Sequence, residues 1–396
     1  MEVSYVLDWL NLLARWAHLI FGIAWIGASF YFVWLDNSLE KPPKTGNPLH
    51  LGELWSLHGG GFYHNVKYKG GPEKMPEHLH WFIWESYSTW ISGFFLICVL
   101  YYTSAETYLV DKNIAELSRT EAIGIGLGFL AGGWLVYDRL CVWLAKDEKA
   151  LAIAVYIYCI AAAFALTHLF SGRGAFLHFG AMLATIMTAN VFFVIVPGQR
   201  KTVKALEEGR VPDPAWGAAA KHRSVHNTYF TLPVLFCMIS NHYAMTYSGK
   251  QAWLVLLALS LAGVLIRLFF VFKHAAPPKW WLMAAGLVII GVVAWALKPA
   301  PLPKPVEGAK GPVFADVKRI VSERCTGCHA ATPTFQGFNA APKGYLFDSD
   351  ERIVTQAQLI HQQTVVTRVM PIGNITNMTD AERAVIDGWF RAGAKP

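Results

Sequence analysis

The sequence predicts an all-α membrane protein in which an eight-span transmembrane helix bundle is followed by a small all-α domain. Composition is the first reason, because hydrophobic residues make up 54% of the 396 residues and charged residues only 15%, and 16 residues are tryptophan. Length is the second, because eight apolar runs approach or exceed the roughly 20 residues that cross a bilayer core. The third is a Cys-x-x-Cys-His motif at residues 325–329, beyond the last apolar run.

The apolar runs define a membrane domain at residues 1–297. They lie near residues 8–36, 81–103, 122–144, 150–169, 174–197, 226–247, 252–273 and 279–297. The first and fifth runs share a weak similarity around His18 and His178, and the third and seventh each carry an arginine, Arg139 and Arg267. These pairs are compatible with a 4+4 parallel repeat, because four spans preserve the direction of the chain. The alternative is that any eight helices can be paired this loosely.

The motif at residues 325–329 is the attachment signature of haem c. Cys325 and Cys328 would form thioethers to the porphyrin, and His329 would be the proximal iron ligand. The alternatives are a chance match or half of a zinc site, but zinc needs a second pair of ligands and no further cysteine lies C-terminal to position 237. A methionine is a common second axial ligand. Met370, in an irregular stretch, is preferred to Met378, which precedes a Thr-x-x-Glu capping box.

Residues 312–396 are therefore predicted to form a class I-like cytochrome c domain. A segment this short buries a small core, and the covalent haem supplies part of the missing apolar volume. Residues 298–311 precede the domain as a proline-rich linker, a composition typical of an extended spacer.

Basic residues predict the orientation of the bundle. With the N-terminus outside, the outer connections carry only Lys112, Arg119, Arg173 and Lys250, and the remaining basic residues of the connections lie inside, as the positive-inside rule requires. Eight spans then return the C-terminal domain to the outside, where bacteria attach haem c. The sequence therefore predicts a multi-pass protein of the bacterial inner membrane with a periplasmic N-terminus and haem domain. The net charge of +7 follows from this asymmetry and gives no sign of nucleic-acid binding.

Ionisable side chains inside the predicted spans are costly and are functional candidates for that reason. Each one alone is more often structural, but together they exceed what a passive membrane anchor needs. They are Arg15, His18, Glu85, Arg139, His168, His178, His242 and Arg267. The connection between the first two spans adds a glycine cluster flanked by histidines at residues 57–64, which fits either a ligand site or an interfacial loop.

Several motifs together resemble one known family. They are Arg-Trp-Ala-His at 15–18, Trp-Ile-Gly-Ala-Ser-Phe-Tyr-Phe at 25–32, His-Gly-Gly-Gly-Phe-Tyr at 58–63, Leu-His-Trp-Phe-Ile-Trp-Glu at 79–85 and Met-Pro-Ile-Gly-Asn at 370–374, with the Cys-x-x-Cys-His motif. The chain resembles the bacterial membrane urate oxidase (urate hydroxylase) family with a fused cytochrome c domain. The resemblance implies oxidation of urate to 5-hydroxyisourate in purine breakdown. It also implies that electrons pass through haem c to a downstream cytochrome c or terminal oxidase, without formation of hydrogen peroxide.

Urate is a planar anion, so its oxidation calls for a base and a cationic partner. We expect His80 or Glu85 as the base, because a histidine is poised near neutral pH and a buried glutamate can become so. Arg139 or Arg267 would offset the urate charge.

Electron transfer adds a further expectation. If urate arrives from the cytoplasm, its electrons must cross a bilayer core of about 30 Å, and a haem b held by His18 and His178 would divide that distance. A periplasmic substrate site would remove the need for this cofactor. Two other functions stay as alternatives, namely an electron-transfer protein that passes electrons from quinol to cytochrome c, and a transporter or sensor with an appended cytochrome.

Overall fold

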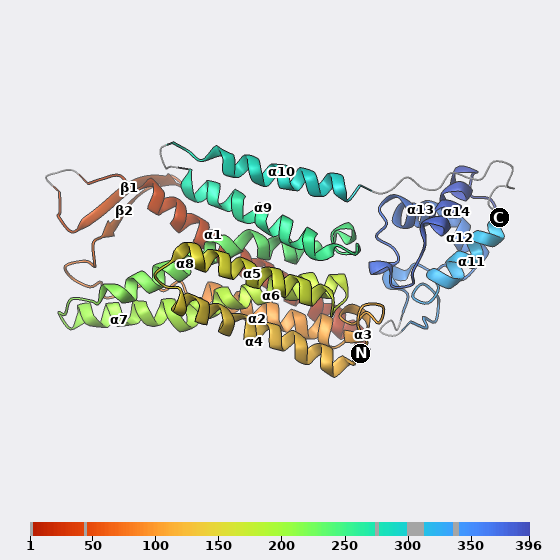
Figure 1. The fold of residues 1–396 in the computed structure, drawn as a ribbon, viewed down its shortest axis with the longest axis horizontal. Helices are drawn as coiled ribbons and strands as arrows, with labels where there is room; N and C mark the ends of the chain where they lie inside the picture. Colours follow the sequence, from red (N-terminus) through yellow and green to blue (C-terminus); the bar gives the residue numbers. More distant parts are fainter. Residues whose placement is uncertain (1–2, 43–45, 274–276, 299–312, 336–339) are drawn as a thin grey trace.

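The structure, a computed structural model, describes residues 3–42, 46–273, 277–298, 313–335 and 340–396 (Figure 1). The N-terminal bundle contains α1 (Val3–Ser38), α2 (Trp84–Ile97) with a π-helical turn (Cys98–Tyr102), α3 (Ala105–Tyr108), α4 (Arg119–Trp143), α5 (Glu148–Thr167), α6 (Gly172–Asn190), a π-helical turn (Val191–Ile195), α7 (Val196–Glu207), α8 (Pro214–Ser240), α9 (Ala252–Phe272) and α10 (Trp280–Ala296). The C-terminal unit contains α11 (Phe314–Arg324), α12 (Asp350–Thr355), α13 (Ala357–His361) and α14 (Asp380–Arg391).

Every predicted span overlaps a helix or a continuous helical stretch of the bundle, although the sixth, at 226–247, extends beyond the end of α8 at Ser240. Five stretches of the described chain are long and apolar enough to cross a bilayer, namely Trp9–Ser38, Arg119–Trp143, Glu148–Thr167, Gly172–Glu207 and Ala252–Phe272, and α10 is a shorter apolar helix. The protein therefore carries a membrane-spanning domain. The count of eight crossings stays a prediction, because length and apolarity alone do not establish it for α2, α8 and α10.

Helix α6 forms the centre of the bundle, where it packs against α8, α4, α5 and α2. It buries Phe176, Phe179 and Ile186 almost completely. Gly180 allows α8 to approach closely, because a Cβ atom at this position would lie 2.4 Å from Cβ of Cys237. Small residues at helix contacts are typical of membrane bundles, in which van der Waals packing replaces the hydrophobic effect.

Helix α1 lies at the edge of the bundle and packs mainly along α2. It leaves many large apolar side chains exposed, Trp16 and Ile23 among them. In a bilayer these side chains would contact lipid, so their exposure carries no cost.

The prediction of an all-α fold is wrong at the connection between α1 and α2. Strands β1 (His50–His58) and β2 (Gly61–Tyr68) form an antiparallel hairpin there. Gly59 and Gly60 make its two-residue turn with φ angles of 59° and 81°, which glycine adopts without strain. Trp55 stacks on His64 across the strands at 4.2 Å between ring centroids, a cross-strand pair that favours the sheet. The histidine-flanked glycine cluster is therefore a hairpin tip.

The C-terminal unit packs α11 against α14 around a core that includes Val317, Ile320, Ile386 and Trp389. The predicted capping box at the start of α14 is confirmed by reciprocal hydrogen bonds between residues 379 and 382. Met378, just before it, is buried in this core. The predicted proline-rich linker, apart from its first residue, lies outside the described residues.

Candidate functional site

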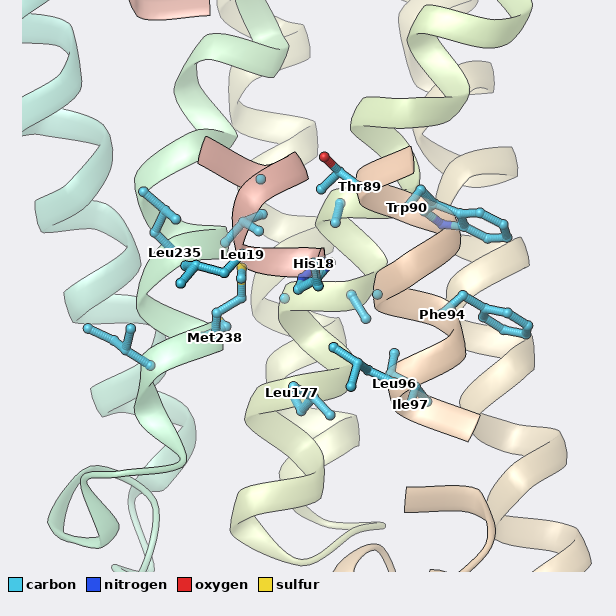
Figure 2. Close-up of a pocket in the computed structure, with 18 of the residues that line it drawn as sticks. His18, Leu19, Thr89, Trp90, Phe94, Leu96, Ile97, Leu177, Leu235 and Met238 are labelled. Atoms are coloured by element: carbon cyan, nitrogen blue, oxygen red, sulfur yellow. The ribbon is translucent and has the colours of Figure 1, made fainter. Parts of the chain in front are cut away.

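A cavity of about 680 Å³ lies between α1, α2, α6 and α8. Figure 2 shows His18 of α1 at its centre, with Trp90 of α2, Leu177 of α6 and Met238 of α8 around it. Most of the lining is apolar, and the polar groups are few. This size and this character are typical of small-molecule sites in proteins.

The polar groups at one end of the cavity are held together by hydrogen bonds. Arg173, in the first turn of α6, donates from Nε to the Tyr101 hydroxyl (3.1 Å) and to Oδ1 of Asn241 (3.2 Å). The Tyr101 hydroxyl donates to the same Asn241 oxygen at 2.9 Å. Arg15 of α1 also lines the cavity but is exposed and is not part of this hydrogen-bonded group; it donates from Nε to Asn11, one turn earlier in α1, at 2.6 Å. We call Arg15, Tyr101, Arg173 and Asn241 the cationic end.

Neither arginine of the cationic end is paired with a carboxylate within the described residues. Both use Nε for the bonds to neutral partners, and no described side chain or carbonyl accepts from their Nη atoms. Among the described residues, no Asp or Glu lines the cavity. The Nη atoms of both arginines therefore remain as hydrogen-bond donors without an acceptor among the described residues.

His18 lies deeper in the cavity, on the α1–α2 contact. Its Nδ1 lies 3.0 Å from the Ser92 hydroxyl. Gly93 makes room for the ring, because a Cβ atom there would lie 2.9 Å from Cε1 of His18. Thus the histidine is fixed by α2 while it faces the cavity.

The structure does not place His178 on this cavity. Its ring is fully buried, with Nδ1 2.8 Å from the Gly174 carbonyl and Nε2 3.2 Å from the Tyr102 hydroxyl. Gly126 of α4 lies against the same edge of the ring. Thus Nδ1 is bonded within α6 and Nε2 lies beside Tyr102, and His178 does not line the cavity that contains His18. A haem b held by these two histidines stays a prediction.

The four residues expected to be catalytic lie away from the cavity. The His80 ring is exposed and packs edge-on against Phe82. Glu85, at the start of α2, has one buried carboxylate oxygen without a partner in the described chain. Neither residue lines the cavity.

The two arginines expected to be catalytic, Arg139 and Arg267, also do not line the cavity. Arg139 is 58% exposed and pairs with the neighbouring Asp138, so it is not part of a buried site. Arg267 is buried against the Phe30 ring, 3.8 Å from its centroid. Two of its nitrogens have no partner among the described residues.

A buried polar network joins α4, α6 and α8 outside the cavity. Arg223 donates to Asp138 at 2.7 Å and to Asn190 at 3.3 Å. Asn190 in turn donates to the Tyr137 hydroxyl (3.3 Å), which lies 2.7 Å from Nδ1 of His226. By sequence, Arg223 lies in a predicted inner connection, so this network was not predicted. Asp138, a carboxylate inside the third predicted span, was the residue that could have indicated a buried cationic partner.

The Cys-x-x-Cys-His segment begins where α11 ends. The His329 Nδ1 lies 3.0 Å from the Tyr345 carbonyl, so it is the donor and leaves Nε2 unprotonated for a metal, as in many metal-bound histidines. Burial raises the pKa of both cysteines, that of Cys325 to about 12, so both thiols lie largely inside the C-terminal unit. Met370 is half-buried. These features fit a covalent haem held by Cys325, Cys328 and His329.

Comparison with known proteins gave one match. The sequence model of a protein family described as urate oxidase N-terminal matches residues 4–298. No curated protein and no solved structure matched the chain. The matched residues cover the whole helical bundle and stop where the linker begins.

Proposed function

Because the chain belongs to the urate oxidase N-terminal family, we propose that its membrane domain oxidises urate to 5-hydroxyisourate and that the electrons leave through haem c on the C-terminal unit. The family supports a urate-related oxidoreductase, and five helical stretches that are long and apolar enough to cross a bilayer support a membrane location. With the orientation predicted from the basic residues, the haem unit faces the periplasm and the downstream acceptor is a cytochrome c or terminal oxidase.

The observation that carries the electron-transfer part is the geometry of His329. Its Nδ1 is committed to the Tyr345 carbonyl, which fixes the tautomer and the orientation of the ring. Cys325 and Cys328 lie just before this histidine and are not joined in a disulfide, so both sulfur atoms would be available for thioether bonds. Met370 is the proposed second axial ligand, because Met378 belongs to the hydrophobic core.

The reaction balances without oxygen as a reactant. The urate monoanion and one water molecule give 5-hydroxyisourate, one proton and two electrons. A bound haem c supplies a one-electron acceptor, so the electrons leave singly. The protein must bind the anion, admit water to it and take up the proton. The proposal requires no haem b in the membrane.

Anaerobic mixing of urate with the oxidised, purified full-length protein tests this function. We expect the haem c spectrum to change to that of the reduced form, with 5-hydroxyisourate as the product and no hydrogen peroxide. The Cys325→Ala, Cys328→Ala variant, which cannot attach haem, should not turn over. Reduction by a quinol but not by urate would support the electron-transfer alternative and refute the proposal. A pyridine haemochrome assay on the same sample counts haem b and haem c separately.

A further inference from the structure

We infer that the cationic end of the cavity is the urate-binding site, with Arg15 and Arg173 as the residues that bind the anion, and that urate reaches it from the end of the bundle at which the N-terminus lies. This inference rests on the proposed function, but it concerns a site that the matched family does not specify. It also replaces the candidates His80, Glu85, Arg139 and Arg267.

Charge is the first argument. A guanidinium in an apolar membrane domain is costly unless an opposite charge or several hydrogen bonds compensate it. Arg173 is held by neutral groups, namely the oxygens of Asn241 and Tyr101 and the faces of the Tyr101 and Tyr108 rings, whose centroids lie 5.7 Å and 5.0 Å from its Cζ. The more exposed Arg15 is held by the neutral Asn11. A bound anion supplies the missing negative charge, and urate is an anion at neutral pH.

Hydrogen-bond geometry is the second argument. Guanidinium groups bind planar anions through two parallel N–H donors. The Nη atoms of both arginines have no acceptor in the described part of the chain, while the bonds from Nε hold each group in place. Urate offers carbonyl oxygens and a delocalised negative charge around the rim of a flat ring. The apolar walls next to the cationic end would then contact its faces.

Location is the third argument. Arg173 lies in the first turn of α6, Tyr101 in the last turn of the helical stretch that begins with α2, and Asn241 directly after α8. These helix ends lie at the end of the bundle where α1 begins and where α10 leaves it, as Figure 1 shows. The chain continues from there to the haem-attachment segment. Electrons from urate bound there need not cross the membrane, which removes the reason for a haem b between His18 and His178.

Arginine variants of the full-length protein test the binding role. We expect Arg173→Gln and Arg15→Gln each to raise the urate KM by about 10- to 100-fold, the usual effect of losing a charge-assisted hydrogen bond. The haem c spectrum should stay unchanged. Arg173→Lys should recover part of the affinity, because it restores the charge without the planar fork. Arg139→Gln is the matched control and should leave KM unchanged, because that side chain is exposed and paired with Asp138.

A neutral competitor separates binding of charge from general damage. If Arg173 only holds the helices together, its loss should weaken inhibition by an uncharged purine such as hypoxanthine as much as it weakens urate binding. Under the inference, the urate KM rises and the inhibition constant of hypoxanthine changes less than threefold. Equal losses for both purines would overturn the binding role of Arg173.

Oriented proteoliposomes test the side of access. Urate added on the side of the C-terminal unit should reduce haem at once, and urate enclosed on the opposite side should not. Reduction only from the side of the β1–β2 hairpin would refute the location. Failure of urate to reduce wild-type haem from either side would refute the proposed function itself, so the two failures are distinguishable.

Discussion

Replacement of Asp138 by Asn tests the buried pair between α4 and α8. The two side chains are only 10% and 7% exposed, and the Arg223–Asp138 distance is 2.7 Å. The Asn side chain keeps the shape of Asp138 but removes its charge. Arg223 then stays buried against the Tyr137 ring, 5.1 Å from its centroid, and its charge is unpaired, because the new amide oxygen at position 138 and the Asn190 oxygen are both neutral acceptors.

The expected cost is about 3–5 kcal/mol, the usual effect of removing one partner from a buried ion pair. Asp138 also pairs with Arg139, but that side chain is 58% exposed, so its share should be about 1 kcal/mol or less. Arg139→Gln is therefore the matched control for the exposed half of the interaction. Asp138→Leu combined with Arg223→Met should recover most of the loss, because no unpaired charge stays buried.

Chemical denaturation in detergent, followed by tryptophan fluorescence, measures these differences, and a double-mutant cycle isolates the coupling of the pair. Because the network lies outside the cavity, the urate KM of the folded Asp138→Asn protein should stay near that of the wild type. If Asp138→Asn costs no more than Arg139→Gln, the pair does not stabilise the bundle and the reasoning fails.

Three further predictions concern the C-terminal unit and the topology. Met370→Ala should abolish the weak absorption band at the red end of the oxidised spectrum that reports methionine–iron bonding. Met378→Ala should keep the band and lower the free energy of unfolding by about 2–5 kcal/mol. The opposite pattern would reverse the ligand assignment. Burial of Asp387 opposes its charged form, but hydrogen bonds, the first from His361, outweigh this and lower its pKa. The Asp387 carboxylate therefore stabilises the folded unit above the ordinary Asp pKa, and this stabilisation is lost as the pH falls through the lowered pKa. In the Asp387→Asn variant the free energy of unfolding of the C-terminal unit should depend less on pH in the acid range. A reporter fused after Lys204 should be cytoplasmic and one at the C-terminus periplasmic; a periplasmic signal after Lys204 would refute the orientation.

The sequence alone predicted the helical stretches of the bundle and the start of α14. Apolar runs of this length have few other stable conformations in a bilayer, because the backbone must satisfy its own hydrogen bonds there. The capping box at Thr379 is likewise local, since its two hydrogen bonds join residues three positions apart. The haem-attachment motif and the 4+4 repeat also came from the sequence, and both stay predictions.

The hairpin between α1 and α2 shows where pattern reading failed. The glycines at its tip fitted either a ligand site or an interfacial loop, because glycine permits both a turn and close approach of a ligand. The pairing Trp55↔His64 shows that the segment is a hairpin, and a cross-strand pair is visible only when both strands are considered together.

The candidate site was decided by tertiary structure. Ionisable residues inside the predicted spans were candidates by sequence, whereas Arg173 was assigned to an outer connection. Sequence spacing does not tell which of these side chains face one another across helices. Folding brings Arg173 onto Asn241 and Tyr101, turns His178 toward Tyr102 and leaves Arg139 outside. The composition of the chain and its long apolar runs, with ionisable residues inside them, indicated a membrane protein with buried charge. The packing of α1, α2, α6 and α8 decided which charges meet in a cavity, because side chains distant in sequence become neighbours only there.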